Sequence, residues 1–189
     1  AVCPTCEALR TTTFQYRDVP LEASKTVAKD VLVAVCDACG SIASVPHQSA
    51  PRLYQARVEA RKKLEARIPR HLQDVLLVIA LELRAEPKPF GGAVVRYYLR
   101  QALQHPRVAR RLVRLAGSAD AQGRADARLS FAVNESWYDR FQATLPGEVV
   151  PDRSALVRGA IVALQQDYYE RPSKGTIKVL EAIAEAAHV

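Results

Sequence analysis

Two segments of this 189-residue chain repeat the same order of sequence patterns, and this repeat limits the possible folds more than any other feature. In KLEARI (63–68), polar and apolar residues alternate, and RLSFAV (128–133) alternates in the same phase. Alternation with period two is typical of a strand that buries one face and exposes the other. We therefore expect two strands, each with one side against a core.

Each predicted strand is followed by two amphipathic segments. The first copy continues with PRHLQDVLLVIALELR (69–84) and AVVRYYLRQAL (93–103), and the second with NESWYDRFQATL (134–145) and ALVRGAIVALQ (155–165). The second helices share the pattern V-V-R-x-x-L and L-V-R-x-x-I. Two strand–helix–helix copies in one chain indicate an internal structural repeat.

The repeat suggests how the copies combine. A single exposed strand leaves its backbone N–H and C=O groups unpaired, and two such strands satisfy each other as an antiparallel ribbon. The predicted class is therefore α+β, mostly α, with the ribbon lying on four helices. The apolar positions expected in the core are Leu64, Ala66, Ile68, Leu76, Ile79, Leu83, Val95, Leu99, Leu129, Phe131, Val133, Trp137, Phe141, Leu156 and Ile161.

This pattern resembles the ribbon–helix–helix family of Arc, MetJ and CopG-like repressors, which normally forms the ribbon by dimerisation. Here the two halves share a chain, as an intramolecular pseudodimer. The resemblance implies that the ribbon enters the major groove of double-stranded DNA. It assigns base contacts to the exposed residues of both strands: Lys63, Glu65, Arg67, Arg128, Ser130 and Ala132. Because the two strands differ, the expected DNA site is asymmetric, and Ala132 offers only a methyl contact.

The same resemblance places DNA phosphates at the start of each second helix. The matching residues are Gly91 and Gly92 in the first copy, and Arg153 and Ser154 in the second. Free N–H groups and the helix dipole favour an anion there. A plain turn at the glycines and a plain N-cap at Asp152 or Ser154 are the alternatives.

The positive charge of the chain is concentrated in its middle. Residues 51–116 have a net charge of +10, whereas residues 1–50 have −1 and residues 117–189 have −2. A basic block between near-neutral segments favours contact with a polyanion. The helix expected at 106–117 adds four candidate phosphate contacts, unless it is simply a solvated face: Arg107, Arg110, Arg111 and Arg114.

All four cysteines of the chain lie in two CxxC knuckles, C3-P-T-C6 and C36-D-A-C39. This spacing is typical of a four-thiolate zinc site, and two disulfides are the alternative. Four protein ligands leave no open position on the metal, so one structural Zn²⁺ per chain is expected. Redox sensing by the thiolates is a further alternative.

The fragments CPTC, TFQYR and VAVCDACG resemble the N-terminal zinc ribbon of YgiT/MqsA-type antitoxins, over about residues 1–45. In that family the ribbon is a dimerising or toxin-contacting module. The resemblance therefore implies a toxin, another protein or a second copy of the chain as partner.

The predicted organisation assigns every part of the chain. It comprises a zinc ribbon (1–46), a helical linker (47–61), the first repeat (62–104), a basic helix and linker (105–126), the second repeat (127–169) and a C-terminal helix (170–189).

The function predicted from these parts is sequence-specific DNA binding, as a transcriptional repressor or antitoxin. An accessory factor of plasmid transfer or partition and a protein-interaction adaptor are the alternatives. Scattered histidines and the lack of a glycine-rich phosphate loop favour a protein that is not an enzyme. The start, AVCPTCEALR, lacks the pattern of a secretory signal, and we expect a cytoplasmic, nucleoid-associated protein without a membrane span.

Overall fold

The computed structural model describes residues 1–21, 26–134 and 136–187 and shows a mixture of helices and small sheets. The predicted α+β class is confirmed at this level. The chain divides into two compact units, Ala1–Lys62 with Asn134–Ser136, and Lys63–Val133 with Trp137–Val189. Residues 22–25 of the predicted zinc ribbon, 135 of the second repeat and 188–189 of the predicted C-terminal helix lie outside the described residues.

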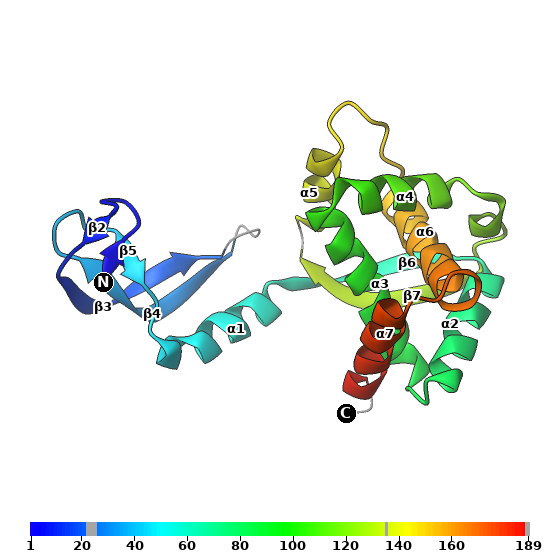
Figure 1. Ribbon diagram of the computed structural model, residues 1–189, viewed down its shortest axis with the longest axis horizontal. Coiled ribbons are helices and arrows are strands. Elements are labelled where there is room, and N and C mark those ends of the chain that lie inside the picture. Colours follow the sequence, from blue (N-terminus) through cyan, green and yellow to red (C-terminus); the bar gives the residue numbers. More distant parts are fainter. Residues whose placement is uncertain (22–25, 135, 188–189) are drawn as a thin grey trace. The chain divides into compact units, whose positions relative to one another are not determined.

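The first unit is built on two small antiparallel sheets (Figure 1). Strands β1 (Val2–Cys3) and β2 (Ala8–Leu9) form a short hairpin. Strands β3 (Thr12–Pro20), β4 (Val27–Cys36) and β5 (Ile42–Ser44) form a second sheet with β4 in its centre. Valine recurs along β4, and its branched side chain packs well on a pleated surface.

A helix covers one face of this sheet. The 3-10 turn η1 (His47–Ser49) leads into α1 (Ala50–Glu59), and the Ser49 hydroxyl donates a hydrogen bond to the Leu32 carbonyl oxygen at 2.8 Å. The buried core of the unit combines residues of the sheet with apolar residues of the helical segment, namely Val31, Val33 and Val35 with Leu53, Ala56 and Ala60. The segment predicted as a linker (47–61) therefore packs on the sheet.

Two strands distant in sequence pair in the second unit. Strand β6 (Arg61–Ile68) pairs with β7 (Ala127–Asn134), and the two run in opposite directions (Figure 1). The inward positions Ala66, Ile68 and Phe131 are buried, while the residues between them are more exposed. The pair is called the β6–β7 ribbon below.

Two helices follow each strand of the ribbon. After β6 come α2 (Arg70–Glu82) and α3 (Pro87–Gln104). After β7 come α5 (Trp137–Thr144) and α6 (Arg153–Gln165). The connection between the copies contains α4 (Pro106–Ala116) and the 3-10 turn η2 (Ala119–Ala121). The chain ends with the π-helical turn η3 (Gln166–Glu170) and α7 (Lys174–Ala186).

One hydrophobic core joins these helices to the inner face of the ribbon. All of the predicted core residues belong to it or pack against it. Helix α6 is buried along most of its length and packs closely on α4, because Gly159 has no side chain to hold them apart. None of the helices in the described part of the chain combines the length and apolar character needed to span a membrane.

Candidate metal centre and candidate nucleic-acid interface

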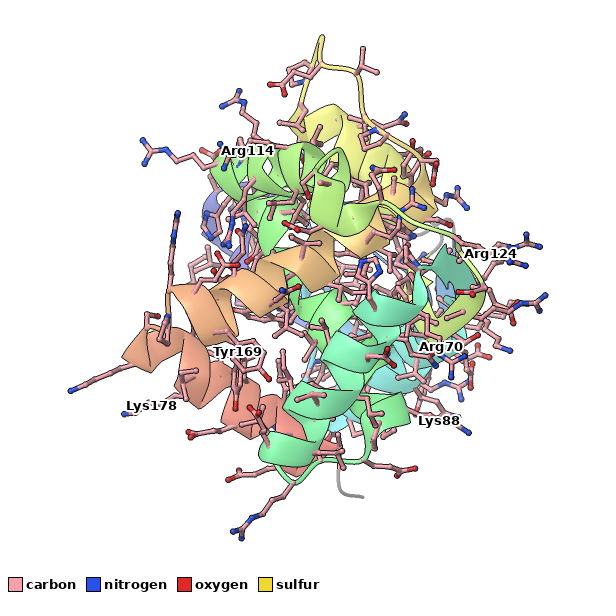
Figure 2. The ribbon with its side chains drawn as sticks, turned by 90° about the vertical axis from the view of Figure 1, so that its right-hand side faces the viewer. Arg70, Lys88, Arg114, Arg124, Tyr169 and Lys178 are labelled. Atoms are coloured by element: carbon pink, nitrogen blue, oxygen red, sulfur yellow. The ribbon has the colours of Figure 1, made fainter. Side chains whose placement is uncertain are left out.

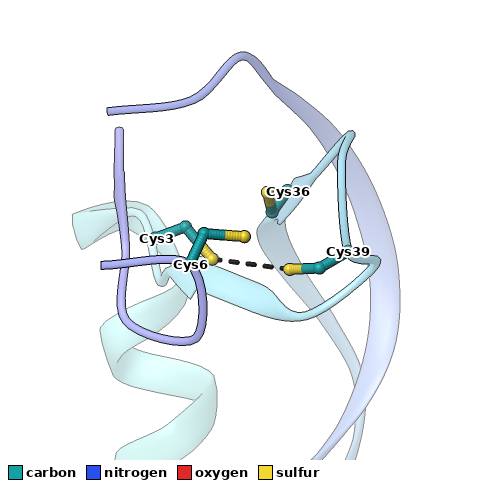
Figure 3. A group of neighbouring side chains, drawn as sticks. All are labelled: Cys3, Cys6, Cys36 and Cys39. Carbon is teal, nitrogen blue, oxygen red and sulfur yellow. Dashed lines mark hydrogen bonds between the residues drawn. The ribbon is translucent and has the colours of Figure 1, made fainter. Parts of the chain in front are cut away.

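The four cysteine side chains meet at one end of the first unit (Figure 3). Cys3 and Cys6 come from the β1–β2 hairpin, and Cys36 and Cys39 from the end of β4 and the turn after it. All four Sγ atoms lie within 4.8 Å of one another, and the Sγ atoms of Cys3 and Cys39 are 3.5 Å apart. Tetrahedral Zn–S bonds of about 2.3 Å would separate the sulfurs by about 3.8 Å. The cluster can therefore hold a metal ion.

Local backbone structure fixes the second knuckle. Gly40 has a φ of +72°, a conformation that side-chain-bearing residues rarely adopt, and its N–H donates to the Cys36 carbonyl oxygen at 2.8 Å. The Thr13 hydroxyl donates to Asp37 at 2.8 Å, tying the turn to β3. These contacts within the protein fix the conformation of the turn independently of a metal ion.

The cluster is electrostatically uneven. Hydrogen bonds from the hydroxyl and the backbone N–H of Ser41 lower the pKa of Cys39 to about 6. Hydrogen bonding to Cys39 and Cys3 raises the pKa of Cys6 to about 12. Because thiolates are the metal-binding form, a metal ion would displace protons from this cluster.

The outer face of the β6–β7 ribbon carries most of the residues predicted to contact bases. Lys63, Glu65, Arg67, Arg128 and Ser130 are exposed. By contrast, Ala132 is half-buried. Both strands of the ribbon therefore contribute polar side chains to one solvent-facing row.

Interactions within this row set the charge of Glu65. Its carboxylate lies 3.0 Å from the Lys63 ammonium nitrogen, and the Ser130 hydroxyl donates to it at 3.4 Å from the other strand. The hydrogen bond from Lys63 is the main reason that the pKa of Glu65 is lowered. Glu65 is therefore an ionised acceptor at neutral pH.

The structure corrects the predicted position of the double glycine. The segment predicted as a loop (85–92) contributes the first turns of α3, which begins at Pro87. Gly91 and Gly92 lie inside the helix and are buried, and a Cβ on Gly92 would be 2.8 Å from the Phe131 Cβ. The glycines thus bring α3 close to the ribbon, and they cannot present free N–H groups to a phosphate.

The second predicted clamp lies at a helix start, but that start is capped. Arg153 and Ser154 open α6, and the Asp152 carboxylate accepts a hydrogen bond from the Ala155 N–H at 2.9 Å. The Arg153 guanidinium lies over the Tyr138 ring, 5.2 Å from its centroid. A carboxylate already occupies the place that an anion would take.

The four arginines of α4 have different environments. Arg111 forms a two-pronged pair with Asp167, with N–O distances of 2.7 and 3.0 Å, and Tyr98 donates to the same carboxylate at 2.9 Å. Arg111 was predicted to contact a phosphate, but its guanidinium instead pairs with Asp167 and so links α4 to η3. Arg110 pairs with Glu148 at 2.8 Å on the surface. The last two, Arg107 and Arg114, are exposed.

Three cations near the ribbon were missed by the sequence interpretation. Arg70, Lys88 and Arg124 point to one side of the second unit, whereas Arg114 and Lys178 point to the other (Figure 2). Arg70 follows β6 and Arg124 precedes β7, so they flank one end of the antiparallel ribbon. For Arg70 and Arg124, the available signal was their position just outside the alternating strands.

Comparisons of the chain with models of known protein families, with curated proteins and with solved structures found no match.

Proposed function

We propose that this chain is a sequence-specific DNA-binding protein that reads the major groove with the outer face of the β6–β7 ribbon. The observation that carries the proposal is the exposed row formed by Lys63, Glu65, Arg67, Arg128 and Ser130 across two paired strands. Lys and Arg can bond guanine, and ionised Glu65 can accept from cytosine N4. The proposed fold is a single-chain ribbon–helix–helix pseudodimer.

Charges beside the ribbon support DNA as the ligand. Arg70, Lys88 and Arg124 lie on a common side of the unit and are exposed, as phosphate contacts need to be (Figure 2). Lys88 is in the first turn of α3, where the helix dipole also favours an anion. In the proposed set of phosphate contacts, these residues replace six of the earlier candidates: Gly91, Gly92, Arg111, Arg114, Arg153 and Ser154.

The proposed metal is one structural Zn²⁺ held by the four cysteines. Four thiolate ligands in a closed tetrahedral site are typical of zinc. Because the hydrophobic core of the first unit is small, metal binding would contribute a large part of its stability. The first unit would then be a zinc ribbon.

A feature of the first unit favours a repressor or antitoxin with a protein partner. The side chains of Phe14 and Tyr16 on β3 are 63% and 71% exposed. Tyr16 pairs with Leu32, whereas the neighbouring Val31 and Val33 belong to the core under α1, so the aromatic residues lie on the opposite face. We propose that this face contacts a toxin or another protein.

Selection from a random pool of duplexes tests the DNA function. The purified chain is expected to enrich one motif without two-fold symmetry, because the two strands differ in sequence. The proposal would be contradicted if the bound duplexes share no sequence motif, or if the chain retains no duplex at about 50 mM salt.

Elemental analysis of the purified chain tests the metal. One zinc per chain is expected, and Cys36→Ser is expected to lose zinc and the folded signals of the first unit. Ala38→Ser, in the same exposed turn, is the matched control and keeps both. Metal-free folded protein would rule out the structural zinc.

A further inference from the structure

A groove of about 550 Å³ lies beside the ribbon within the second unit. Its apolar lining includes Leu76, Leu77 and Leu129. The side chains of Leu76 and Leu129 meet over Gly91, where a Cβ would be 3.4 Å from each of them. Small-molecule sites in proteins have volumes of about 300–1,000 Å³. The open groove therefore has room for the apolar body of a small ligand.

The polar lining of the groove is predominantly cationic. Arg70, Lys88 and Arg128 line it, and among the described residues Asp74 is the one carboxylate in the lining. The balance of charge therefore favours an anionic group in the groove.

Two helix starts add to this positive potential. Arg70 begins α2, and Pro87 and Lys88 lie in the first turn of α3. Among the described residues, neither start has a side-chain cap. The positive ends of two helix dipoles therefore border the groove without the carboxylate that closes α6.

We infer that this groove binds a small organic acid with an apolar body, such as an aromatic sulfonate or a medium-chain carboxylate. The apolar body lies against Leu76, Leu77 and Leu129. The acid group lies among Arg70 and Lys88, at the two helix starts, and Arg128 of β7. An uncharged apolar molecule would leave those cations without a partner, and inorganic phosphate would leave the leucines uncovered.

The position of the groove links this ligand to the ribbon. Arg128 and Ser130 line the groove and also belong to the exposed row of the ribbon. An acid in the groove would pair with Arg128 and add negative charge beside the DNA site. We infer that binding of the organic acid releases the protein from DNA, and this step rests on the proposed DNA-binding function.

A fluorescence titration of the full chain with 8-anilinonaphthalene-1-sulfonate, without DNA, tests the site directly. Saturable binding at one site per chain is expected. Leu77→Glu places a negative charge at the edge of the groove and is expected to weaken binding about tenfold or more. Lys88→Gln is expected to weaken it several-fold, and dodecanoate is expected to displace the probe.

Matched controls separate the groove from other apolar surface. Leu81→Glu makes the same change one turn along α2, at a side chain that is 61% exposed and outside the groove. Lys178→Gln removes an equal charge from the other side of the unit (Figure 2). Both controls are expected to bind the probe as the wild type does. Non-saturable binding, or equal loss in Leu77→Glu and Leu81→Glu, would overturn the site.

A second arm tests regulation, with a duplex obtained by selection. The sulfonate is expected to weaken DNA binding by the wild type and to have little effect on Leu77→Glu. If the probe binds with the expected pattern but the chain binds no DNA, the proposed function fails while the site stands. If DNA binds and the probe does not, the site fails alone. Probe binding without any effect on DNA binding would overturn the regulatory link.

Discussion

The two strand–helix–helix copies of the second unit share an order of elements but differ at the start of their second helices. In the first copy, no side chain in the described part of the chain caps the start of α3, and Lys88 is exposed beside the ribbon. In the second, Asp152 caps α6, and Arg153 lies over Tyr138. An anion is therefore favoured at α3 and opposed at α6.

The copies also differ in how they use glycine. Gly92 lets α3 approach the ribbon, where its neighbour is the Phe131 side chain. Gly159 lets α6 approach α4, where its neighbours are backbone atoms of Leu112 and Ala116. We propose from this comparison that the first copy contacts DNA, whereas α6 of the second copy forms the centre of the core.

The largest expected effect comes from filling the contact between α6 and α4. Gly159→Ala places a Cβ 2.9 Å from the Ala116 backbone nitrogen and still closer to the Leu112 carbonyl oxygen, so the helices must move apart. We expect the free energy of unfolding to fall by about 3 kcal/mol in chemical denaturation.

Two further substitutions calibrate that result. Gly92→Ala should cost less, about 1–2 kcal/mol, because its Cβ would clash with one atom, the Phe131 Cβ at 2.8 Å, whereas the Cβ at position 159 would clash with two backbone atoms. Gly175→Ala should change stability little, because the nearest atom to its Cβ among the described residues is the Ser173 hydroxyl oxygen, 4.0 Å away. A smaller loss for Gly159→Ala than for Gly92→Ala would reverse the proposed roles.

The next effect concerns the pair that links the copies through α4. Asp167→Ala removes the partner of both Arg111 and Tyr98, whose side chains come from α4 and α3. We expect a loss of about 2 kcal/mol, because the buried Tyr98 hydroxyl loses its acceptor and the partly buried Arg111 guanidinium is left with the Gln166 side-chain oxygen at 3.2 Å. Thermal unfolding measures it, with Glu148→Ala, an exposed partner of Arg110, as the control expected to cost under about 1 kcal/mol. Equal losses would show that the Asp167 pair is no more than a surface contact.

A smaller effect tests the helix starts in DNA binding. Lys88→Ala is expected to weaken binding of a selected duplex about tenfold, and Arg153→Ala less than about twofold. Fluorescence anisotropy at fixed salt measures both. If the two substitutions weaken binding equally, the copies contact phosphates alike and the contrast between α3 and α6 is lost for DNA.

The smallest effect on DNA binding is expected for a single polar residue of the ribbon, Ser130. Ser130→Ala removes one polar group from the exposed row of the ribbon, together with the hydrogen bond to Glu65. We expect a change in base preference at one or two positions of the motif, with affinity altered by less than about threefold. Repeating the duplex selection measures this preference. An unchanged motif would show that Ser130 does not contact a base.

Local patterns predicted the parts of the fold that depend on neighbouring residues. Alternation in residues 63–68 and 128–133 corresponds to the burial seen in β6 and β7. The two CxxC spacings predicted a cluster that the structure shows. In both cases, the residues that determine the outcome lie within a few positions of one another along each segment.

The errors arose where a distant partner decides the structure. The run Pro-Lys-Pro-Phe-Gly-Gly (87–92) is typical of a loop, yet Pro87 and Pro89 fit the first helical turn. Position 92 requires glycine because Phe131 of the other copy lies against it. Arg111 matched a solvent-facing basic helix, but Asp167 lies 56 residues further along the chain. Neither contact is visible from local spacing.

The most direct test of the account measures discrimination between the selected duplex and a scrambled one, at the same salt, for two double variants. Lys63→Ala/Arg67→Ala changes the ribbon, and Arg114→Ala/Lys178→Ala removes the same charge from two residues that point to the other side of the unit (Figure 2). The account predicts that the ribbon variant loses discrimination and keeps weak, salt-sensitive binding, while the other keeps its discrimination. Equal discrimination in both variants would contradict a ribbon that reads bases.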